Sequence, residues 1–521
     1  MIDWELSTSL LFCLIPFLFL FFIKTTLTNL LSSNKSTSKI PKSYPIIGSY
    51  FSILTNKERR IQWTSDVIQN TSNLTFTLNR PFGFRQIFTA NPANVQHILK
   101  TQFHIYQKGN VFKTTMADFL GDGIFNVDGD IWKYQRQVSS HEFNTKSLRK
   151  FVETVVDTEL NERLIPILAT AAVEKTVLDF QDILQRFAFD NICKIAFGYD
   201  PAYLLPSLPQ AKFAVAFEEA VKLSSERFNA IFPFLWKIKR KLNIGSEKKI
   251  RVAVDDVRQF AKELVKEKQK ELKEKSSLES VDLLSRFLST GHSDEDFVTD
   301  IVISFILAGR DTTSAALTWF FWLISECPET ENQILKEIKA KSESPVYDEV
   351  KDMIYTHASL CESMRFYPPV PIDTKAATED NILPDGTFVK KGTRVSYHPY
   401  AMGRVEKLWG KDWAEFRPER WLDKDEVSGN WTFMARDAYT YPVFQAGPRI
   451  CLGKEMAFLQ MKRVVAGVLR RFKVVPVAEK GVEPVFVSYL TAKMKGGFPV
   501  TIEERNTTDL SSFNYGQKVR E

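Results

Sequence analysis

The sequence predicts a mainly α-helical protein with small β-sheets, and three features indicate this fold class. Long stretches with helical periodicity follow Trp132 and fill most of the chain. Short β-prone runs such as LTFTL and RQIFTA lie between Pro41 and about residue 100. An apolar stretch from Asp300 to Ile324 carries Arg310 and Asp311 at its centre. Because these charges would be costly in lipid, the stretch is predicted to be a helix buried inside a large protein.

The composition limits the classes of protein to which the chain can belong. The chain has 521 residues, of which 44% are apolar and 25% are charged, so it can bury a large core and is not expected to be disordered. No linker interrupts the middle of the chain, which favours one large body. The net charge of +6 is small for this length, so we expect no nucleic-acid partner and a monomeric protein. The five cysteines are scattered singly, which indicates neither a disulfide framework nor a zinc site of paired cysteines.

The N-terminus predicts a membrane anchor over residues 1–24. Leu10 to Ile23 is an unbroken apolar run near the lower limit for spanning a bilayer, and acidic residues precede it, unlike the basic start of a cleaved signal peptide. Lysines follow the run and none precedes it, which predicts that the main body faces the cytosol. We expect a Ser-, Lys- and Pro-rich linker over residues 25–45, a catalytic domain over residues 46–505 and a flexible C-terminal tail over residues 506–521.

Two segments between the β-prone region and the central apolar stretch have readable patterns. Trp132 and Arg136 lie four residues apart, which puts an indole donor and a guanidinium on one helix face. That pairing suits a cofactor with carboxylates. The stretch from Val257 to Lys275 is dense in charges of both signs and predicts a solvated helix with many close ion pairs.

The central apolar stretch contains a polar patch in a specific order, with Ala308 and Gly309 before Asp311 and Thr312. A threonine hydroxyl in a helix can donate to the carbonyl four residues back and bend the helix, and for Thr312 that carbonyl belongs to Ala308. Gly309 leaves room for a small molecule to approach the backbone. The alternative is a core helix with one satisfied polar kink.

Further along, the pattern indicates paired charges. Glu362 and Arg365 lie three residues apart on a predicted helix that Pro368 ends, so their side chains share a face. Arg420 stands in an aromatic setting, FRPERW. A second arginine beside the Glu362–Arg365 pair could lock a buried charge, although ordinary surface ion pairs are the commoner alternative.

The most informative cysteine is Cys451, in the stretch FQAGPRICLG together with Phe444, Gly447, Arg449 and Gly453. No second cysteine lies nearby in the sequence, so a redox pair is not indicated. The remaining alternatives are an idle thiol in a turn, a lone nucleophile or a metal ligand.

Together these motifs resemble the cytochrome P-450 superfamily of haem-thiolate monooxygenases, over nearly the whole chain. The family pattern is matched at the cysteine loop, at the Ala308–Thr313 patch, at the Glu362–Arg365 pair and at Arg420, where Trp421 follows in place of the usual phenylalanine. The resemblance implies the triangular helical prism of that fold, preceded by a single N-terminal transmembrane helix.

It also implies roles for the site residues. Cys451 would be the axial thiolate on the iron of haem b, with the glycines of its loop allowing backbone amides to approach the sulfur. Asp311 and Thr312 would organise water and deliver protons. Trp132, Arg136 and Arg449 would pair with the haem propionates, and Lys375 and His398 are further candidates for that task.

Within the superfamily the chain is similar to the plant fatty-acid ω-hydroxylase branch, its ninety-fourth family, in stretches such as PKSYPIIGSY and YPPVPIDTKAA. This implies terminal hydroxylation of medium- and long-chain fatty acids at the endoplasmic reticulum membrane, with dioxygen and with electrons from NADPH through the FAD and FMN of cytochrome P-450 reductase. The alternative substrate is a hormone conjugate such as jasmonoyl-isoleucine. A reductase-independent haem-thiolate isomerase or a haem-binding sensor is disfavoured, because the distal threonine and the cysteine loop are intact.

The resemblance also suggests which residues line the substrate cavity. Lys108 and Lys113 could meet a substrate carboxylate near the mouth, or could be ordinary surface charges. Four of the expected cavity residues lie in a predicted loop before Trp132, namely Phe119, Leu120, Ile124 and Phe125. The others are Ala308, Val370, Ile372 and Leu490.

Overall fold

The computed structural model describes residues 40–209, 212–274, 282–289, 294–425, 430–479 and 481–505. The predicted anchor over residues 1–24, most of the predicted linker and the predicted tail over residues 506–521 lie outside these ranges. Within the described ranges, no helix is both long enough and apolar enough to cross a bilayer.

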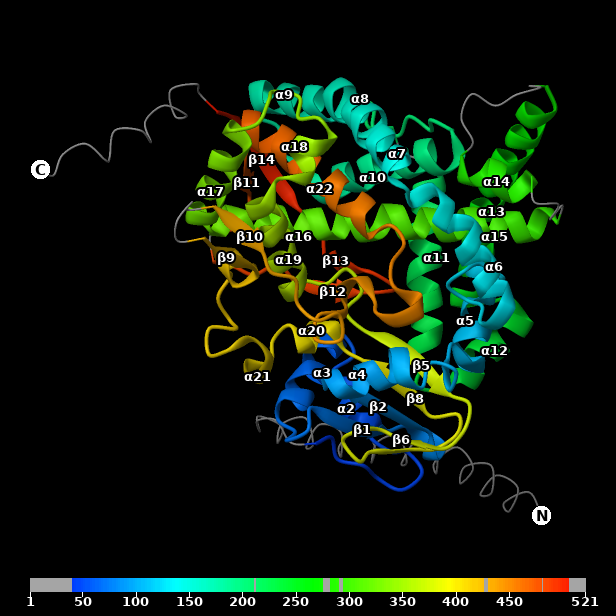
Figure 1. Cartoon of the computed structure of the whole chain (residues 1–521). Helices are drawn as coiled ribbons and strands as arrows, with labels where there is room; N and C mark the ends of the chain where they lie inside the picture. Colours follow the sequence, from blue (N-terminus) through cyan, green and yellow to red (C-terminus); the bar gives the residue numbers. More distant parts are fainter. Residues whose placement is uncertain are drawn as a thin grey trace, which may run out of the picture.

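Helices dominate the described chain, which confirms the predicted fold class (Figure 1). The predicted charged helix is α13 (Gly245–Glu274), which begins before Val257 because Ile250 and Val254 continue its buried face. The other helices between the sheets are α2 (Tyr50–Thr55), α3 (Arg60–Gln69), α4 (Pro92–Gln96), α5 (Gly109–Leu120), α6 (Gly129–Ser140), α7 (Thr145–Lys150), α8 (Asp157–Glu159), α9 (Ile165–Glu174), α10 (Phe180–Phe197), α11 (Lys212–Asn229), α12 (Pro233–Leu242), α14 (Leu283–Ser289), α17 (Pro328–Lys339), α18 (Tyr347–Lys351), α19 (Ile354–Phe366), α20 (Pro399–Met402), α21 (Glu406–Trp409) and α22 (Lys454–Arg471).

The predicted buried helix crosses the molecule as three consecutive segments (Figure 1). These are α15 (Glu295–Ile306), the π-helical turn η6 (Leu307–Asp311) and α16 (Thr312–Glu326). Asp294 caps its start, because the side chain accepts from the backbone amide of Asp296. Pro328 opens α17 directly afterwards, since proline is tolerated in a first turn but not in a helix interior.

The β-prone region supplies two strands of a five-stranded sheet at the lower end of the molecule in Figure 1. Phe76 and Phe88 are cross-strand partners in its first hairpin, and their rings stack with centroids 5.2 Å apart. Helix α3 packs against the same two strands. In spatial order the strands are β1 (Thr75–Asn79), β2 (Arg85–Thr89), β8 (Arg394–Tyr397), β5 (Asp373–Ala377) and β3 (Tyr106–Gln107), with β2 and β8 parallel and the other pairs antiparallel.

The remaining strands form small sheets between the helices, again as predicted. The buried apolar residues gather in three clusters, one around α16, α19 and α22, one around α10, α11 and α13, and one against the five-stranded sheet. The small sheets are β11–β14–β4 (Phe472–Pro476, Pro499–Glu504, Leu178–Asp179), β12–β13 (Phe486–Ser488, Ala492–Met494), β9–β10 (Leu422–Lys424, Trp431–Phe433) and β6–β7 (Asn381–Ile382, Phe388–Val389).

Candidate functional site

A cavity of about 430 Å³, lined mostly by apolar side chains, lies where the three clusters meet. Leu78 lines it from β1, Leu120 from α5 and Ala316 from α16. The loop before α22 completes the wall with Phe444 and Cys451. The site therefore depends on segments from the first, middle and last thirds of the chain.

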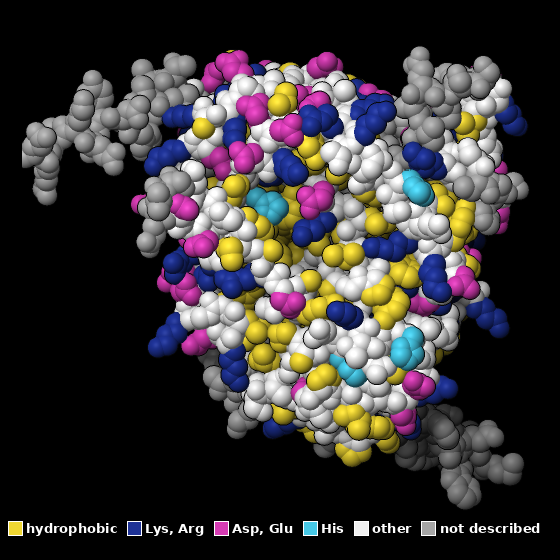
Figure 2. All heavy atoms as spheres, in the orientation of Figure 1, with side chains coloured by type: hydrophobic (Ala, Val, Ile, Leu, Met, Phe, Trp, Pro, Cys, Tyr) yellow, Lys and Arg dark blue, Asp and Glu magenta, His cyan; other side chains and the backbone are white. Residues whose placement is uncertain are grey.

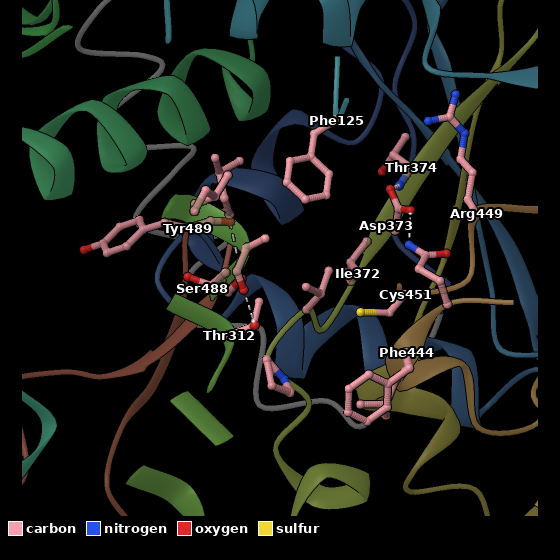
Figure 3. A pocket seen from close by; sticks show the side chains of 18 of the residues that line it. Phe125, Thr312, Ile372, Asp373, Thr374, Phe444, Arg449, Cys451, Ser488 and Tyr489 are labelled. Carbon is pink, nitrogen blue, oxygen red and sulfur yellow. Dashed lines mark hydrogen bonds between the residues drawn. The ribbon is translucent and has the colours of Figure 1, made fainter. Parts of the chain in front are cut away.

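The loop that carries Cys451 has an unusual backbone. Gln445 and Gly447 adopt left-handed conformations, with φ of 62° and 64°. A Cβ on Gly447 would lie 2.1 Å from the carbonyl oxygen of Leu99, so only glycine fits at this position. The Cys451 amide donates to the Phe444 carbonyl at 2.8 Å, which closes the loop. Figure 3 shows that the sulfur points into the cavity.

The surroundings of the sulfur act on its charge in opposite directions. Cys451 lines the cavity and is exposed to it. Protein nevertheless surrounds the thiol on its other sides and shields it from bulk water. This burial raises the pKa of the thiol. The Gly453 amide, which donates to the sulfur, and the positive charge of Arg136 act to lower the pKa. Both would stabilise a thiolate here.

The donor set at this position fits a metal that brings its own ligands. In the described chain, the only cluster of three metal-binding side chains is Glu159, Asp190 and Asp200, and none of the three lines the cavity. Cys451 therefore stands as a single sulfur donor on a cavity wall. Iron in a porphyrin needs one axial ligand of this kind from the protein, because the macrocycle supplies the in-plane nitrogens.

The predicted propionate-binding residues are brought together on one side of the cavity. The guanidinium carbon of Arg449 lies 4.5 Å from the ring centre of Trp132, and that of Arg136 lies 5.9 Å from it. Arg449 is held by hydrogen bonds to the Val127 carbonyl at 2.9 Å and to Asp128 Oδ1 at 2.8 Å. Burial lowers the pKa of both arginines. Two desolvated guanidinium groups beside an indole donor can bind carboxylates.

Asp373, which the sequence analysis did not single out, also lines this side of the cavity (Figure 3). Its Oδ2 accepts from Lys375 at 2.8 Å, Tyr397 at 2.8 Å and Gln445 at 2.7 Å. Although burial alone would raise the pKa of Asp373, Lys375 and Lys108 hold it well below its usual range. The signal was available, because residues two apart in β5 point to the same face and Lys375 was already a candidate.

The predicted propionate contact of His398 is wrong, and for Lys113 the alternative of an ordinary surface charge holds. His398 does not line the cavity; it is buried in the turn before α20, where Nε2 lies 2.9 Å from Thr64 Oγ1 and Nδ1 accepts from the Ala401 amide. Burial lowers its pKa to about 3, so it is neutral. Lys113 is 42% exposed and pairs with Asp128 at 3.0 Å, outside the cavity.

The other predicted lysine, Lys108, is buried and lines the cavity. Burial, and then the charge of Lys375, lower its pKa to about 7. It therefore belongs to the same polar side of the cavity as Asp373 and Arg449.

The central helix meets the cavity at its π-helical turn. The Thr312 hydroxyl donates to the Ala308 carbonyl at 2.6 Å, which confirms the bond predicted from their spacing. Ala308, Gly309 and Thr312 line the cavity. A π-turn within an α-helix is frequently found at a functional site.

Asp311 does not line the cavity, in contrast to the expectation for a proton-delivering pair. It is buried and pairs with Arg310 at 2.6 Å. Burial raises the pKa of Asp311, and the neighbouring Arg310 acts against that rise. Its carboxylate lies against Arg310 instead, whereas Thr312 and Thr313 line the cavity.

The predicted charge network of Glu362, Arg365 and Arg420 forms behind the loop and is buried. Arg365 donates to both oxygens of Glu362, at 2.9 and 2.8 Å, and Arg420 Nε donates to Oε1 at 2.8 Å. Trp421 adds a fourth side-chain bond, from its indole nitrogen to Oε2 at 2.9 Å. The surface alternative is therefore wrong, and every charge in this network has a partner.

The predicted substrate contacts divide into two groups. Phe119 is not part of the cavity wall: it is fully buried in α5, rather than in a loop, and its ring packs edge-on against Phe217 at 5.2 Å. The predicted residues that do line the cavity are Leu120, Ile124, Phe125, Ala308, Val370, Ile372 and Leu490.

Comparison with known proteins gives consistent matches along the chain. A family model described as cytochrome P450 matches residues 39–497. The chain is 65% identical over 512 residues to cytochrome P450 94A2 of Vicia sativa, which covers 97% of this chain and 98% of that protein. It is 45% identical over 508 residues to cytochrome P450 94B1 of Arabidopsis thaliana, covering 97% and 99% of the two chains. Cytochrome P450 94B3 of the same plant is 46% identical over 500 residues, covering 95% and 98%.

Proposed function

The chain belongs to the cytochrome P450 family, and on that premise we propose that it hydroxylates medium- and long-chain fatty acids at the terminal carbon. Members of the family are haem-thiolate monooxygenases. The observation that carries the proposal is that the Cys451 sulfur points into a cavity with mostly apolar walls (Figure 3). Such walls suit an unbranched alkyl chain.

In this proposal the cysteine loop holds haem b. Cys451 is the axial thiolate, and the Gly453 amide that donates to its sulfur tunes the ligand. Trp132, Arg136 and Arg449 hold the propionates. The bound haem supplies the activation of dioxygen and the oxidising power that attack on an unactivated carbon requires.

Thr312 is proposed to hold a water molecule that donates protons during the reaction. Its hydroxyl hydrogen is directed at the Ala308 carbonyl, so the oxygen lone pairs face outward and can accept from water in the cavity. A water held in this way is oriented to donate its other proton. Asp311 lies behind the wall with Arg310, so its role is to set the charge beneath Thr312 rather than to touch the reacting atoms.

Selective attack at the methyl end requires cavity walls that restrict which carbon reaches the reacting centre, because intrinsic reactivity favours the weaker inner carbon–hydrogen bonds. Apolar side chains such as Ile372, Val370 and Leu490 line the same cavity as Cys451 and Thr312 and narrow it. A chain that enters methyl first presents only its last carbon to the oxidant in such a space.

Electrons are proposed to come from NADPH through the FAD and FMN of cytochrome P-450 reductase, at the endoplasmic reticulum membrane with the body in the cytosol. A patch of exposed apolar residues supports membrane contact: Phe82, Phe234 and Ile238 are 58%, 48% and 52% exposed. The Phe232 ring lies within 6.0 Å of Phe82 and 5.9 Å of Phe234, so these segments adjoin. Apolar side chains also gather at the lower end of the face in Figure 2.

The membrane proposal is tested by expressing the full-length chain and a variant that lacks residues 1–38. The shortened protein should keep its haem and bind microsomes more weakly, with residual binding through the apolar patch. In a protease-protection assay, the full-length body should be digested without detergent. A protected body would mean that it faces the lumen.

The substrate proposal is tested by microsomal turnover of a fatty-acid panel with NADPH and a plant reductase, followed by mass spectrometry. Acids of roughly twelve to eighteen carbons should give mainly the ω-hydroxy product, a size compatible with an apolar cavity. Jasmonoyl-isoleucine belongs in the same panel as the alternative substrate. If it turns over efficiently while the fatty acids give no terminal alcohol, it replaces them in this proposal.

A further inference from the structure

Three arginines gather where the cavity meets the five-stranded sheet. Arg60 begins α3, Arg80 follows β1 directly, and Arg394 begins β8. These elements share the lower end of the molecule in Figure 1. Arg60 and Arg80 line the cavity, and the charges of all three are close enough to act on one another. None of them was singled out from the sequence, because they come from three separate segments.

These arginines have no carboxylate partner among the described residues. Arg80 donates to the Ala230 carbonyl at 2.7 Å and to Gln86 Oε1 at 3.3 Å. Arg394 donates one long hydrogen bond, to the Phe228 carbonyl at 3.4 Å, and its guanidinium carbon lies 5.3 Å from the centre of the Phe228 ring. For the Arg60 guanidinium, the described chain offers no hydrogen-bond partner, and no acidic group acts on its pKa.

Three other buried arginines each pair with a carboxylate. Arg227 pairs with Glu247, Arg310 with Asp311, and Arg365 with Glu362. This contrast sets the cluster at the sheet apart, because buried cations are costly unless an anion compensates them.

Burial, and then the charges of Arg80 and Arg60, lower the pKa of Arg394 well below its usual range. Arg60 and Arg80 remain cationic at neutral pH. Burial lowers the pKa of Arg80 to about 10, and burial together with the charge of Arg80 lowers that of Arg60 to about 10. The polar side chains of Gln86, Ser225 and Asn229 line the same region. The cavity thus joins a cationic, polar end to the apolar walls near Cys451.

We propose that Arg60 and Arg80 bind the terminal carboxylate of the substrate, with the nearby charge of Arg394 adding to the attraction, so that the apolar part of the substrate extends toward Cys451. A guanidinium fork pairs with a carboxylate through two parallel hydrogen bonds, which fixes both position and orientation. The inference rests on the proposed function and names the chemical class that the site selects, a free carboxylic acid on an apolar body. An ester, an alcohol or an alkane of the same length lacks the charge that the cluster needs.

The proposed carboxylate site differs from the one that the sequence predicts, which is at Lys108 and Lys113. Lys113 is paired outside the cavity, and Lys108 stands beside Lys375 and Asp373. Arg60 and Arg80, at the sheet, are cavity arginines without a carboxylate partner in the described part of the chain, whereas Arg136 is assigned to the haem propionates.

The test is isothermal titration calorimetry of the haem-loaded, full-length protein with dodecanoic acid and with its methyl ester. The wild type should bind the acid at least about tenfold more tightly than the ester, which corresponds to roughly 1.4 kcal/mol. Arg60→Gln should weaken binding of the acid by about tenfold and leave binding of the ester unchanged. Arg394→Gln should weaken binding of the acid by a smaller factor, because Arg394 acts through its charge and does not line the cavity. Arg60→Gln is the primary variant because it removes no hydrogen bond to a described residue, whereas Arg80 supports the Ala230 carbonyl.

Arg59→Gln is the matched control, since Arg59 is adjacent but exposed and pairs with Asp66 at 2.6 Å. It should bind both compounds as the wild type does. Thermal unfolding verifies that each variant is folded. Equal binding of acid and ester by the wild type, or unchanged acid binding in both Arg60→Gln and Arg394→Gln, would overturn the inference.

The outcome is separable from that of the proposed function. Product analysis of fatty-acid turnover decides where oxygen is inserted, whereas the titration decides how the acid is held. If selective acid binding persists but no ω-alcohol forms, the proposed function fails and the carboxylate site stands.

Discussion

The indole N–H of Trp421 donates a hydrogen bond of 2.9 Å to Oε2 of Glu362, a carboxylate with no solvent exposure. The same oxygen accepts from Arg365 Nε at 2.9 Å, and Oε1 accepts from Arg420 and from the Arg417 amide. Phenylalanine, the usual residue of the family at position 421, has no donor to offer. The substitution in this chain therefore adds a charge-assisted bond to a buried network.

Trp421→Phe should lower the free energy of unfolding by about 1–3 kcal/mol, because a hydrogen bond to a charged group is lost. The thermal midpoint of the haem-loaded protein measures the change. Trp413→Phe is the control, since its partly buried indole makes no side-chain hydrogen bond that the described structure resolves. Equal effects of the two substitutions would show that packing, and not the bond to Glu362, is responsible.

Cys451→Ser should abolish the reduced carbon monoxide band that is characteristic of a thiolate-ligated haem, because a serine hydroxyl does not replace the thiolate. A difference spectrum of the reduced protein measures this. Cys327→Ser, at a half-buried cysteine outside the cavity, should keep the band. Retention of the band in Cys451→Ser would remove this cysteine from the ligand position.

Thr312→Ala should keep haem content and substrate binding but divert reducing equivalents into hydrogen peroxide, because the hydroxyl that holds the proton-donating water is lost. NADPH consumption, peroxide and hydroxylated product are measured together. Thr318→Ala is matched, since Thr318 lies on the same helix and donates to the Ser314 carbonyl at 2.7 Å but does not line the cavity. If coupling is unchanged in Thr312→Ala, the proton path runs elsewhere.

Ile372→Ala should raise the share of subterminal alcohols. Ile372 stands beside the Cys451 sulfur (Figure 3), and a smaller side chain lets inner carbons reach the oxidant. Chromatography of the products gives the ratio of terminal to subterminal alcohol. Ile382→Ala, at a residue that is 61% exposed, should keep the wild-type ratio. An unchanged ratio in Ile372→Ala would assign regioselectivity to another part of the wall.

Local patterns in the sequence predicted the parts of the site that depend on spacing. The Thr312–Ala308 bond follows from a four-residue separation, and the contact between Glu362 and Arg365 follows from a three-residue separation. The central helix followed from a long apolar run with charges that lipid would not accept. These predictions needed no knowledge of how distant segments meet.

The sequence could not predict contacts that only the tertiary fold creates. Arg60, Arg80 and Arg394 approach one another because β2 and β8 pair in parallel across some three hundred residues of chain. Phe119 is predicted to lie in a loop on the cavity wall, but α5 extends to Leu120 and buries the Phe119 side chain in the core. Element boundaries of this kind are set by packing as much as by local preference.

The proposed reaction is the insertion of one oxygen atom from dioxygen at the terminal carbon of a fatty acid, with Cys451 as the residue that would bind the haem iron. The most direct measurement uses dodecanoic acid with a fully deuterated terminal methyl group, NADPH, a plant reductase and isotopically labelled dioxygen. Mass spectrometry of the product should find one labelled oxygen on a terminal carbon that has lost one deuterium and kept the other two. An alcohol that keeps all of its terminal deuterium, or whose oxygen is unlabelled, would contradict the account.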